Sequence, residues 1–206
     1  IQPLDGLFSP ATTADLFPFA TAMGRVQTQT MGFPIGVDMQ HAAYRLDLFD
    51  SPSITWTAVV SSFTPFLFPA GGHTLGVNDM MLIQYLAAGG ELVDTEGNPT
   101  LSQPVLEDVF SFYSDCISTT VISPTALLDI THADESWERL VAGEGGLAVV
   151  PAGRYWLETD ELFSPAFVPT KEGEPLSRWA PRLTETSSRA IVMVCTPVWL
   201  GVMVVW

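Results

Sequence analysis

The strongest constraint on the fold lies in residues 78–99, which read NDMMLIQYLAAGGELVDTEGNP. Residues 80–88 favour a helix and are apolar almost all round, which predicts a helix buried on every side. Asn78 or Asp79 can cap it, because a short side-chain oxygen accepts hydrogen bonds from the free N–H groups of a first turn. The two glycines that follow predict its end, since glycine adopts the left-handed conformation of a C-cap without strain. The two polar residues either serve only as caps or also face whatever lies beyond the helix.

Short apolar strands alternate with helices along the rest of the chain. The predicted strands cover residues 33–37, 66–69, 147–150 and 166–168, and the predicted helices cover 56–63, 102–113 and 134–142. Residues 42–48 form either a strand or a short helix, and residues 151–153 are read as a turn. This alternation predicts an α/β architecture. The length allows one domain or two small lobes.

The composition excludes several classes of function. The 206 residues carry a formal net charge of −15 with only 8 Lys and Arg. Because binding to nucleic-acid phosphates needs clustered basic residues, we expect no nucleic-acid partner. Cys116 and Cys195 match no metal spacing, and a disulfide between them stays open. His41, His73 and His132 lack the spacing of metal ligands, so we expect no metal and no cofactor.

Both ends of the chain are unusual. It begins at Ile1 without a charged and apolar signal segment, so we interpret it as a mature or truncated chain. Residues 190–206 are apolar except for Thr196 and Pro197. That length is at the lower edge of the roughly 17–25 residues of a membrane-spanning helix. The alternative is a buried pair of strands broken at Pro197.

Four motifs follow one another in a distinctive order. They are GFPIGVDMQHAAYRLDLFD at residues 32–50, TW at 55–56, YLAAGGELVDTEGNPTL at 85–101, and SW at 136–137 followed by LAVVPAGRYW at 147–156. In this order and spacing, they resemble the maltose-binding-protein-like solute-binding proteins of carbohydrate ABC transporters. The resemblance implies a periplasmic-binding-protein-like fold, in which two α/β lobes are joined by crossing strands and close over a ligand in the cleft between them.

The resemblance further implies a truncated form of this fold, made mostly of the second lobe. Residues 1–37 would be a remnant of the first lobe with the crossing strand, residues 38–168 the second lobe, and residues 169–206 a return toward the first lobe. From about residue 177 the sequence departs from the family pattern. We interpret that tail as a truncated or out-of-frame ending and assign no function to it.

The resemblance also implies a ligand site. Asp38 falls where the family places a ligand-contacting acid, and Asn78 and Asp79 fall at the helix N-terminus that faces the cleft. Arg154 and Tyr155 fall in a loop where relatives often place a sugar-stacking aromatic residue. Such groups suit sugars, because hydroxyl groups donate strong hydrogen bonds to carboxylates. A few convergent polar groups in a preformed cleft are typical of small-ligand sites.

Several neighbouring residues refine this expectation. Arg45 and Leu46 replace the asparagine and lysine of a family segment of sequence tyrosine-asparagine-lysine-acid-leucine-phenylalanine. Trp56 and Trp137 lie at helical core positions, so we expect them in the core, whereas Trp156 stays open as a platform for a sugar.

We therefore expect a non-enzymatic component of an ABC importer that captures a carbohydrate, or a related solute such as a glycerol-phosphate ester, and delivers it to permease subunits. We expect a monomer, extracytoplasmic and lipid-anchored in a longer form. With most of only one lobe, the chain alone should bind weakly or not at all, because closure needs contacts to both lobes. Two alternatives stay open. One is a carbohydrate-active hydrolase that uses Asp38 and Asp79, and the other is a non-catalytic interaction module with an exposed apolar patch.

Overall fold

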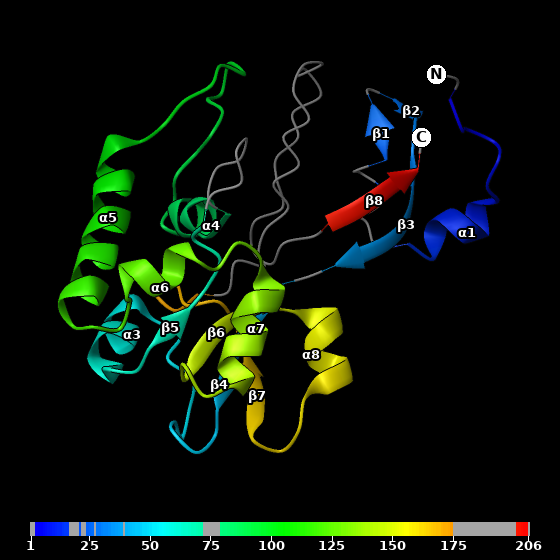
Figure 1. Ribbon diagram of the computed structural model, residues 1–206. Coiled ribbons are helices and arrows are strands. Elements are labelled where there is room, and N and C mark those ends of the chain that lie inside the picture. Colours follow the sequence, from blue (N-terminus) through cyan, green and yellow to red (C-terminus); the bar gives the residue numbers. More distant parts are fainter. Residues whose placement is uncertain are drawn as a thin grey trace.

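The computed structural model describes residues 3–16, 21, 24–26, 28–38, 40–71, 79–174 and 201–205, and these form two unequal regions (Figure 1). The small region contains α1 (Pro10–Ala14), β1 (Arg25–Val26), β2 (Gln29–Thr30), β3 (Phe33–Asp38) and β8 (Gly201–Val205). The large region contains β4 (Gln40–Arg45), α3 (Trp56–Ser62), β5 (Phe66–Leu67), α4 (Asp79–Ala87), α5 (Gln103–Ser118), α6 (Pro124–Leu128), α7 (Ala133–Val141), β6 (Leu147–Pro151), α8 (Ala152–Glu158) and β7 (Phe163–Ala166).

A four-stranded mixed sheet organises the large region, with strand order β5-β6-β4-β7. β5 is parallel to β6, whereas β4 is antiparallel to both β6 and β7. The carboxyl ends of β5, β6 and β7 therefore share one edge with the start of β4. We call this the crossing edge, because β3 leads into β4 there. The opposite edge, where β4 ends and the other three strands begin, is the distal edge.

All five residues of β6 are buried, which shows that the sheet is covered on both faces at this strand. α7 packs on β6 and β5, and α8 packs on β6 and β4, while α3 and α4 pack against α5. A strand covered on both faces is expected to read as a continuous apolar run, as LAVVP does. Mixed packing of helices on a sheet confirms the predicted α/β architecture.

The α4 helix confirms the prediction of a helix buried all round, since none of its residues from Met80 to Ala87 is exposed. It ends where the glycine pair predicts: Gly89 has a φ of +90°, and a Cβ on Gly90 would collide with the ring of Tyr85. The Tyr85 hydroxyl donates to the Glu91 carbonyl oxygen at 2.8 Å and accepts from the Ser102 N–H at 2.7 Å. One buried phenol thus holds both ends of the loop that joins α4 to α5.

Gln84 joins three segments that are distant in sequence. Its side chain is fully buried, accepts a hydrogen bond from the Trp56 indole at 2.6 Å and donates to the Pro169 carbonyl oxygen at 2.8 Å. Thr170, which follows Pro169, donates its main-chain N–H to the Ile54 carbonyl oxygen and accepts from the Trp56 N–H, both at 3.0 Å. The segment that follows β7 is therefore fixed to α3 and α4 before it leaves the large region.

The small region is built on two antiparallel strand pairs, β1 with β2 and β3 with β8. Residues 201–205 thus lie beside the crossing strand, with Asp38 opposite Gly201 and a register irregularity between Pro34 and Val37. Among the described residues, no helix is both long enough and apolar enough to cross a membrane. The domain boundaries at 37 and 168 stay predictions.

Two local predictions were wrong. The strand expected at 166–168 is β7, Phe163–Ala166, because pairing Arg45 with Phe163 and Ala42 with Ala166 sets its register. The loop expected around Arg154 is helix α8, which begins directly after β6. The Pro151-Ala152-Gly153 sequence is typical of a turn, but here Pro151 is the N-cap of a helix. Packing of Tyr155 against the core outweighs the weak local preference.

Candidate ligand site at the crossing edge

The crossing edge brings together the starting points of several elements. β6 runs directly into α8, and Gln40 at the start of β4 pairs with Pro151 at the end of β6. β5 leads toward α4, and β3 ends at Asp38, two residues before β4 begins. In open α/β sheets, ligands bind outside the carboxyl ends of the parallel strands. This edge is therefore the candidate site.

Three of the five predicted site residues are Asp38, Asn78 and Asp79. Asn78 lies outside the described residues. Asp79 is the first residue of α4, and Asp38 is the last residue of β3, which precedes β4 at the crossing edge. Their role as ligand contacts stays a prediction.

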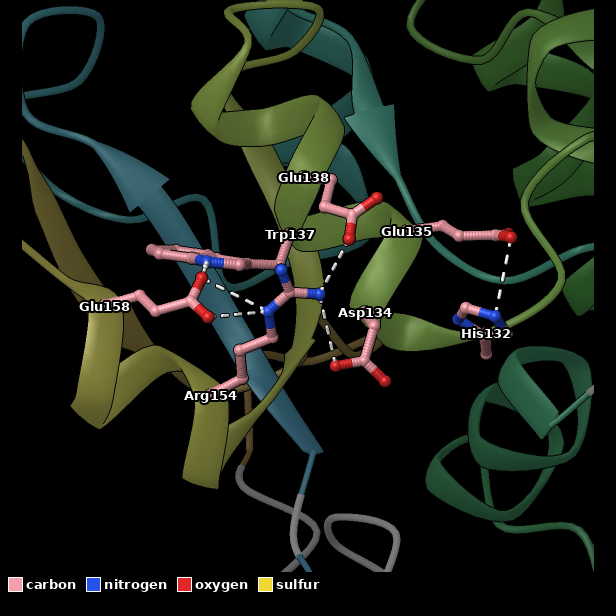
Figure 2. A network of polar contacts seen from close by, with 7 residues as sticks. All are labelled: His132, Asp134, Glu135, Trp137, Glu138, Arg154 and Glu158. Atoms are coloured by element: carbon pink, nitrogen blue, oxygen red, sulfur yellow. Dashed lines mark hydrogen bonds and ion pairs between the residues drawn. The ribbon is translucent and has the colours of Figure 1, made fainter.

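Arg154 is the centre of a charged cluster between α7 and α8 (Figure 2). Its guanidinium group contacts Glu138 at 2.9 Å, Glu158 at 3.0 Å and Asp134 at 3.4 Å. The hydrogen bonds that Arg154 donates to Glu138 and Glu158 raise its pKa above the ordinary value. Its side chain is 28% exposed, so one face of the cluster remains open to solvent.

Glu158 ties this cluster to the core. Its carboxylate accepts a hydrogen bond from the indole N–H of Trp137 at 2.8 Å, in addition to the contact with Arg154. The Trp137 hydrogen bond, followed by that of Arg154, lowers the pKa of Glu158 below its ordinary value. Trp137 itself is 1% exposed, which confirms its predicted core position. Glu158 therefore connects the ion pairs of Arg154 to the buried side chain of Trp137.

Tyr155 points into the core rather than to the surface, with 2% of its area exposed. Its ring centroid lies 4.8 Å from that of His41 and 5.6 Å from that of Trp137, both in edge-on contacts. Its hydroxyl donates to the Phe163 carbonyl oxygen at 3.4 Å. In this conformation the exposed aromatic ring of α8 belongs to Trp156, which is 70% exposed.

His41 is a polar group at this edge that sequence reasoning did not select. Its Nδ1–H donates to the Ala42 carbonyl oxygen at 2.7 Å, which leaves Nε2 as an acceptor. Nε2 is buried and has no hydrogen-bond partner among the described residues. Burial lowers the pKa of His41, because it disfavours the imidazolium form. No sequence signal distinguishes it from the other two histidines.

The cluster around Arg154 was only partly visible in the sequence. The Arg154 and Glu158 pair has helical i, i+4 spacing, as have Asp134 and Glu138, but the helix that carries the first pair was not predicted.

Within the part of the chain that the structure describes, no group of three His, Cys, Asp or Glu residues is arranged to hold a metal ion. Among the described residues the buried Cys116 thiol has no disulfide partner, and Cys195 lies outside them.

Comparison with known proteins identifies the fold. No family model and no curated protein sequence matches the chain, but solved structures do. Maltose-bound MalE3 of T. maritima superposes with a TM-score of 0.72 at 17% sequence identity, over 84% of this chain and 49% of that protein. Over the part that it covers, the chain shares the two-lobe fold of this solved structure.

Other solved structures of the same class agree. A sugar transporter protein of Arthrobacter chlorophenolicus A6 with bound laminaribiose has a TM-score of 0.65 at 16% identity, over 83% of this chain and 47% of its own. A solute-binding protein of Agrobacterium vitis S4 with bound D-mannitol has a TM-score of 0.63 at 17% identity, over 82% of this chain and 46% of its own. The chain thus spans about half the length of the solved structures that it matches.

Proposed function

We propose that this chain is part of the substrate-binding component of an ABC importer, which captures a carbohydrate between two lobes and delivers it to a membrane permease. The observation that carries the proposal is the match to structures solved with maltose, laminaribiose and D-mannitol. It is supported by the crossing edge, where the end of β6, the start of α8 and the start of β4 lie together. Function in this class is binding without chemistry.

The proposed contacts follow from the groups at that edge. Asp38, Asn78 and Asp79 would accept from and donate to the hydroxyl groups of the ligand. Arg154 has one face open to solvent, and its charge is compensated by carboxylates, so it would donate to sugar oxygens without drawing anions. Tyr155 would support the site from the core, by holding α8 on the sheet.

Binding should be coupled to lobe closure, because a ligand favours the closed state only through contacts to both lobes. A chain with most of one lobe forms only part of these contacts. We therefore expect the 206-residue chain alone to bind weakly, and a form extended to both lobes to bind tightly. The working location would be extracytoplasmic, with a lipid anchor on the longer form and a monomer as the active species.

The decisive experiment is thermal melting of the extended form with maltose, laminaribiose and D-mannitol, each sample also being analysed for hydrolysis products. A ligand present at about 100 times its Kd should add about 2.7 kcal/mol to the free energy of unfolding. Asp79→Asn should reduce this shift strongly. Asp115→Asn, at an exposed position of α5, serves as the matched control and should leave it unchanged.

The alternatives give different results in the same experiment. Hydrolysis products that disappear in Asp38→Asn and Asp79→Asn would replace the proposal by a hydrolase. The absence of any shift across a wider panel of sugars and polyols would contradict carbohydrate capture. Sub-micromolar binding by the 206-residue chain, measured by calorimetry, would contradict the need for a second lobe.

A further inference from the structure

The distal edge of the sheet, opposite the candidate ligand site, is a surface made by four loops. Main-chain hydrogen bonds hold them together: Arg45 N–H to the Gly146 carbonyl at 2.9 Å, Leu46 N–H to the Leu162 carbonyl at 2.8 Å, and Gly146 N–H to the Pro65 carbonyl at 3.0 Å. Each of the four strands contributes one loop. In Figure 1 the loops after β4 and before β7 project together at the end of the large region away from β3.

These loops present apolar side chains to solvent. Leu46 is 45% exposed, Leu48 50%, Phe63 71% and Leu162 37%, and we call these four residues the distal patch. They belong to one surface, because Leu46 and Leu162 are joined by their main chains, and the Leu48 side chain packs over Gly146 beside that of Thr64. Single exposed apolar residues are ordinary, but a group of them from three neighbouring loops is typical of an interaction site.

Phe63 is the most unusual residue of the distal patch. It ends α3 with a φ of +51°, in the left-handed region that suits glycine or asparagine and strains a bulky residue. The strain is not offset by burial of the ring, which is 71% exposed. Strained conformations of this kind gather at functional positions. Here the left-handed backbone carries an aromatic ring that is exposed to solvent.

The border of the distal patch is acidic. Asp47 and Glu144 are paired with Arg45 and Arg139, at 2.7 Å and 3.6 Å. Three further carboxylates lie on the same loops: those of Asp50, Asp160 and Glu161, all at exposed positions. The border therefore carries five carboxylates against two guanidinium groups.

We propose that the distal patch docks a protein partner whose contact surface presents an apolar side chain ringed by Lys and Arg. The apolar centre supplies the hydrophobic contact, and the acidic border selects a basic partner, because complementary charge steers association and rejects like charge. A second copy of this chain, which would bring a further formal charge of −15, fits this border poorly. An anionic lipid surface is disfavoured for the same reason. This inference concerns a different edge from the ligand site and does not depend on sugar binding.

The test uses NMR of the ¹⁵N-labelled 206-residue chain with a peptide of sequence Lys-Leu-Lys-Phe-Lys-Leu-Lys, and a second peptide with Glu in place of each Lys. We expect the basic peptide to shift resonances of residues 46–50, 63–65, 144–146 and 160–162. Added salt should weaken this binding. The acidic peptide should produce no shifts.

Substitutions separate docking from folding. Phe63→Asn should raise the Tm, because asparagine tolerates the left-handed conformation, and should weaken peptide binding about ten-fold, as for a truncated anchor residue. Glu161→Lys should also weaken binding. Phe110→Ala, at a phenylalanine of α5 that is 54% exposed, and Glu91→Lys, at an exposed glutamate after α4, are the controls and should bind the peptide like the parent chain.

Several results would overturn the proposal. They are resonance shifts spread over the acidic surface as a whole, equal binding of the acidic peptide, or unchanged binding by Phe63→Asn. Dimerisation in sedimentation experiments that is lost in Phe63→Asn would assign the distal patch to a second copy instead. Sedimentation of the chain with anionic phosphatidylserine vesicles, lost in the same variant, would assign it to a lipid surface.

Discussion

The two edges of the central sheet differ in what their side chains do. At the crossing edge, charged and aromatic groups contact one another: Arg154 binds three carboxylates, and Tyr155 lies between His41 and Trp137. At the distal edge, the loops are joined mainly through their main chains, and the apolar side chains of the distal patch point to solvent. One sheet thus carries a preorganised polar surface at one end and an unpartnered apolar surface at the other.

The difference separates the buried faces of the sheet, which contribute stability, from its edges, where the two proposed binding surfaces lie. Every residue of β6 is buried between helices, so the faces leave no room for a ligand. Groups beyond the strand ends are free of that packing constraint. They can form a binding arrangement or remain exposed without a cost to the core. The predictions below test how far the crossing edge depends on the core beneath it.

The largest effect is expected for Trp137→Ala. Trp137 packs against Tyr155 and Phe163 and donates to Glu158. Truncation of a buried tryptophan should lower the free energy of unfolding by about 3–5 kcal/mol. Chemical denaturation measures the loss. Trp156→Ala, at the exposed neighbour of Tyr155, is the control and should change stability by about 0.5 kcal/mol or less. Equal effects of both variants would contradict a core role for Trp137.

The next effect is expected for Gln84→Leu, which tests the link between α4 and the segment that leaves the large region. The change leaves the Trp56 indole N–H and the Pro169 carbonyl buried without partners. Because such orphaned groups are expensive, the free energy of unfolding should fall by about 2–4 kcal/mol. Gln103→Leu, at an exposed position of α5, should lower it by about 0.5 kcal/mol or less. A fall of the same size in both variants would exclude a special role for Gln84.

A smaller effect, dependent on pH, is expected at His41. Burial holds its folded-state pKa below the unfolded value of about 6.5, so the unfolded chain takes up the proton first as the pH falls. The stabilising contribution of the neutral ring is complete above about pH 6.5 and is lost as the pH falls from there toward the folded-state pKa. The slope can reach about 1.4 kcal/mol per pH unit.

Denaturation of the parent chain and of His41→Gln between pH 7 and pH 5 measures this contribution. The variant should lose part of the slope, because the glutamine side chain does not titrate. Identical slopes for the two chains would show that the ring is not protected from protonation at the crossing edge.

The smallest effect on stability is expected for Arg154→Met. Three carboxylates surround Arg154, but they are 47–60% exposed. Such exposed ion pairs typically contribute about 0.2–1 kcal/mol to the free energy of unfolding. The difference between variant and parent should shrink in high salt. Denaturation at low and high salt tests it. A salt-independent loss above about 2 kcal/mol would show instead that the cluster is part of the core.

Local patterns in the sequence were sufficient for several elements. Thr55 caps α3, accepting from the Ala58 N–H at 3.1 Å, as its position before Trp56 predicts. The apolar run of α4 and the glycines after it define that helix from its start to its end. Helix caps and helix ends depend on residues that are close in sequence, so they can be predicted from the sequence alone. The order of motifs also indicated the fold that the solved structures share.

The sequence by itself therefore determined the α/β class, the buried α4 helix and the fold that the chain shares with the solved structures. Only the tertiary structure decided that α8 is a helix, that Tyr155 lies in the core, and that Arg154 contacts carboxylates up to 20 residues away in sequence. It also brought the loops that carry the distal patch to one edge. The physical reason is that strand order and register place these groups together, and pairing between distant strands leaves no local pattern in the sequence.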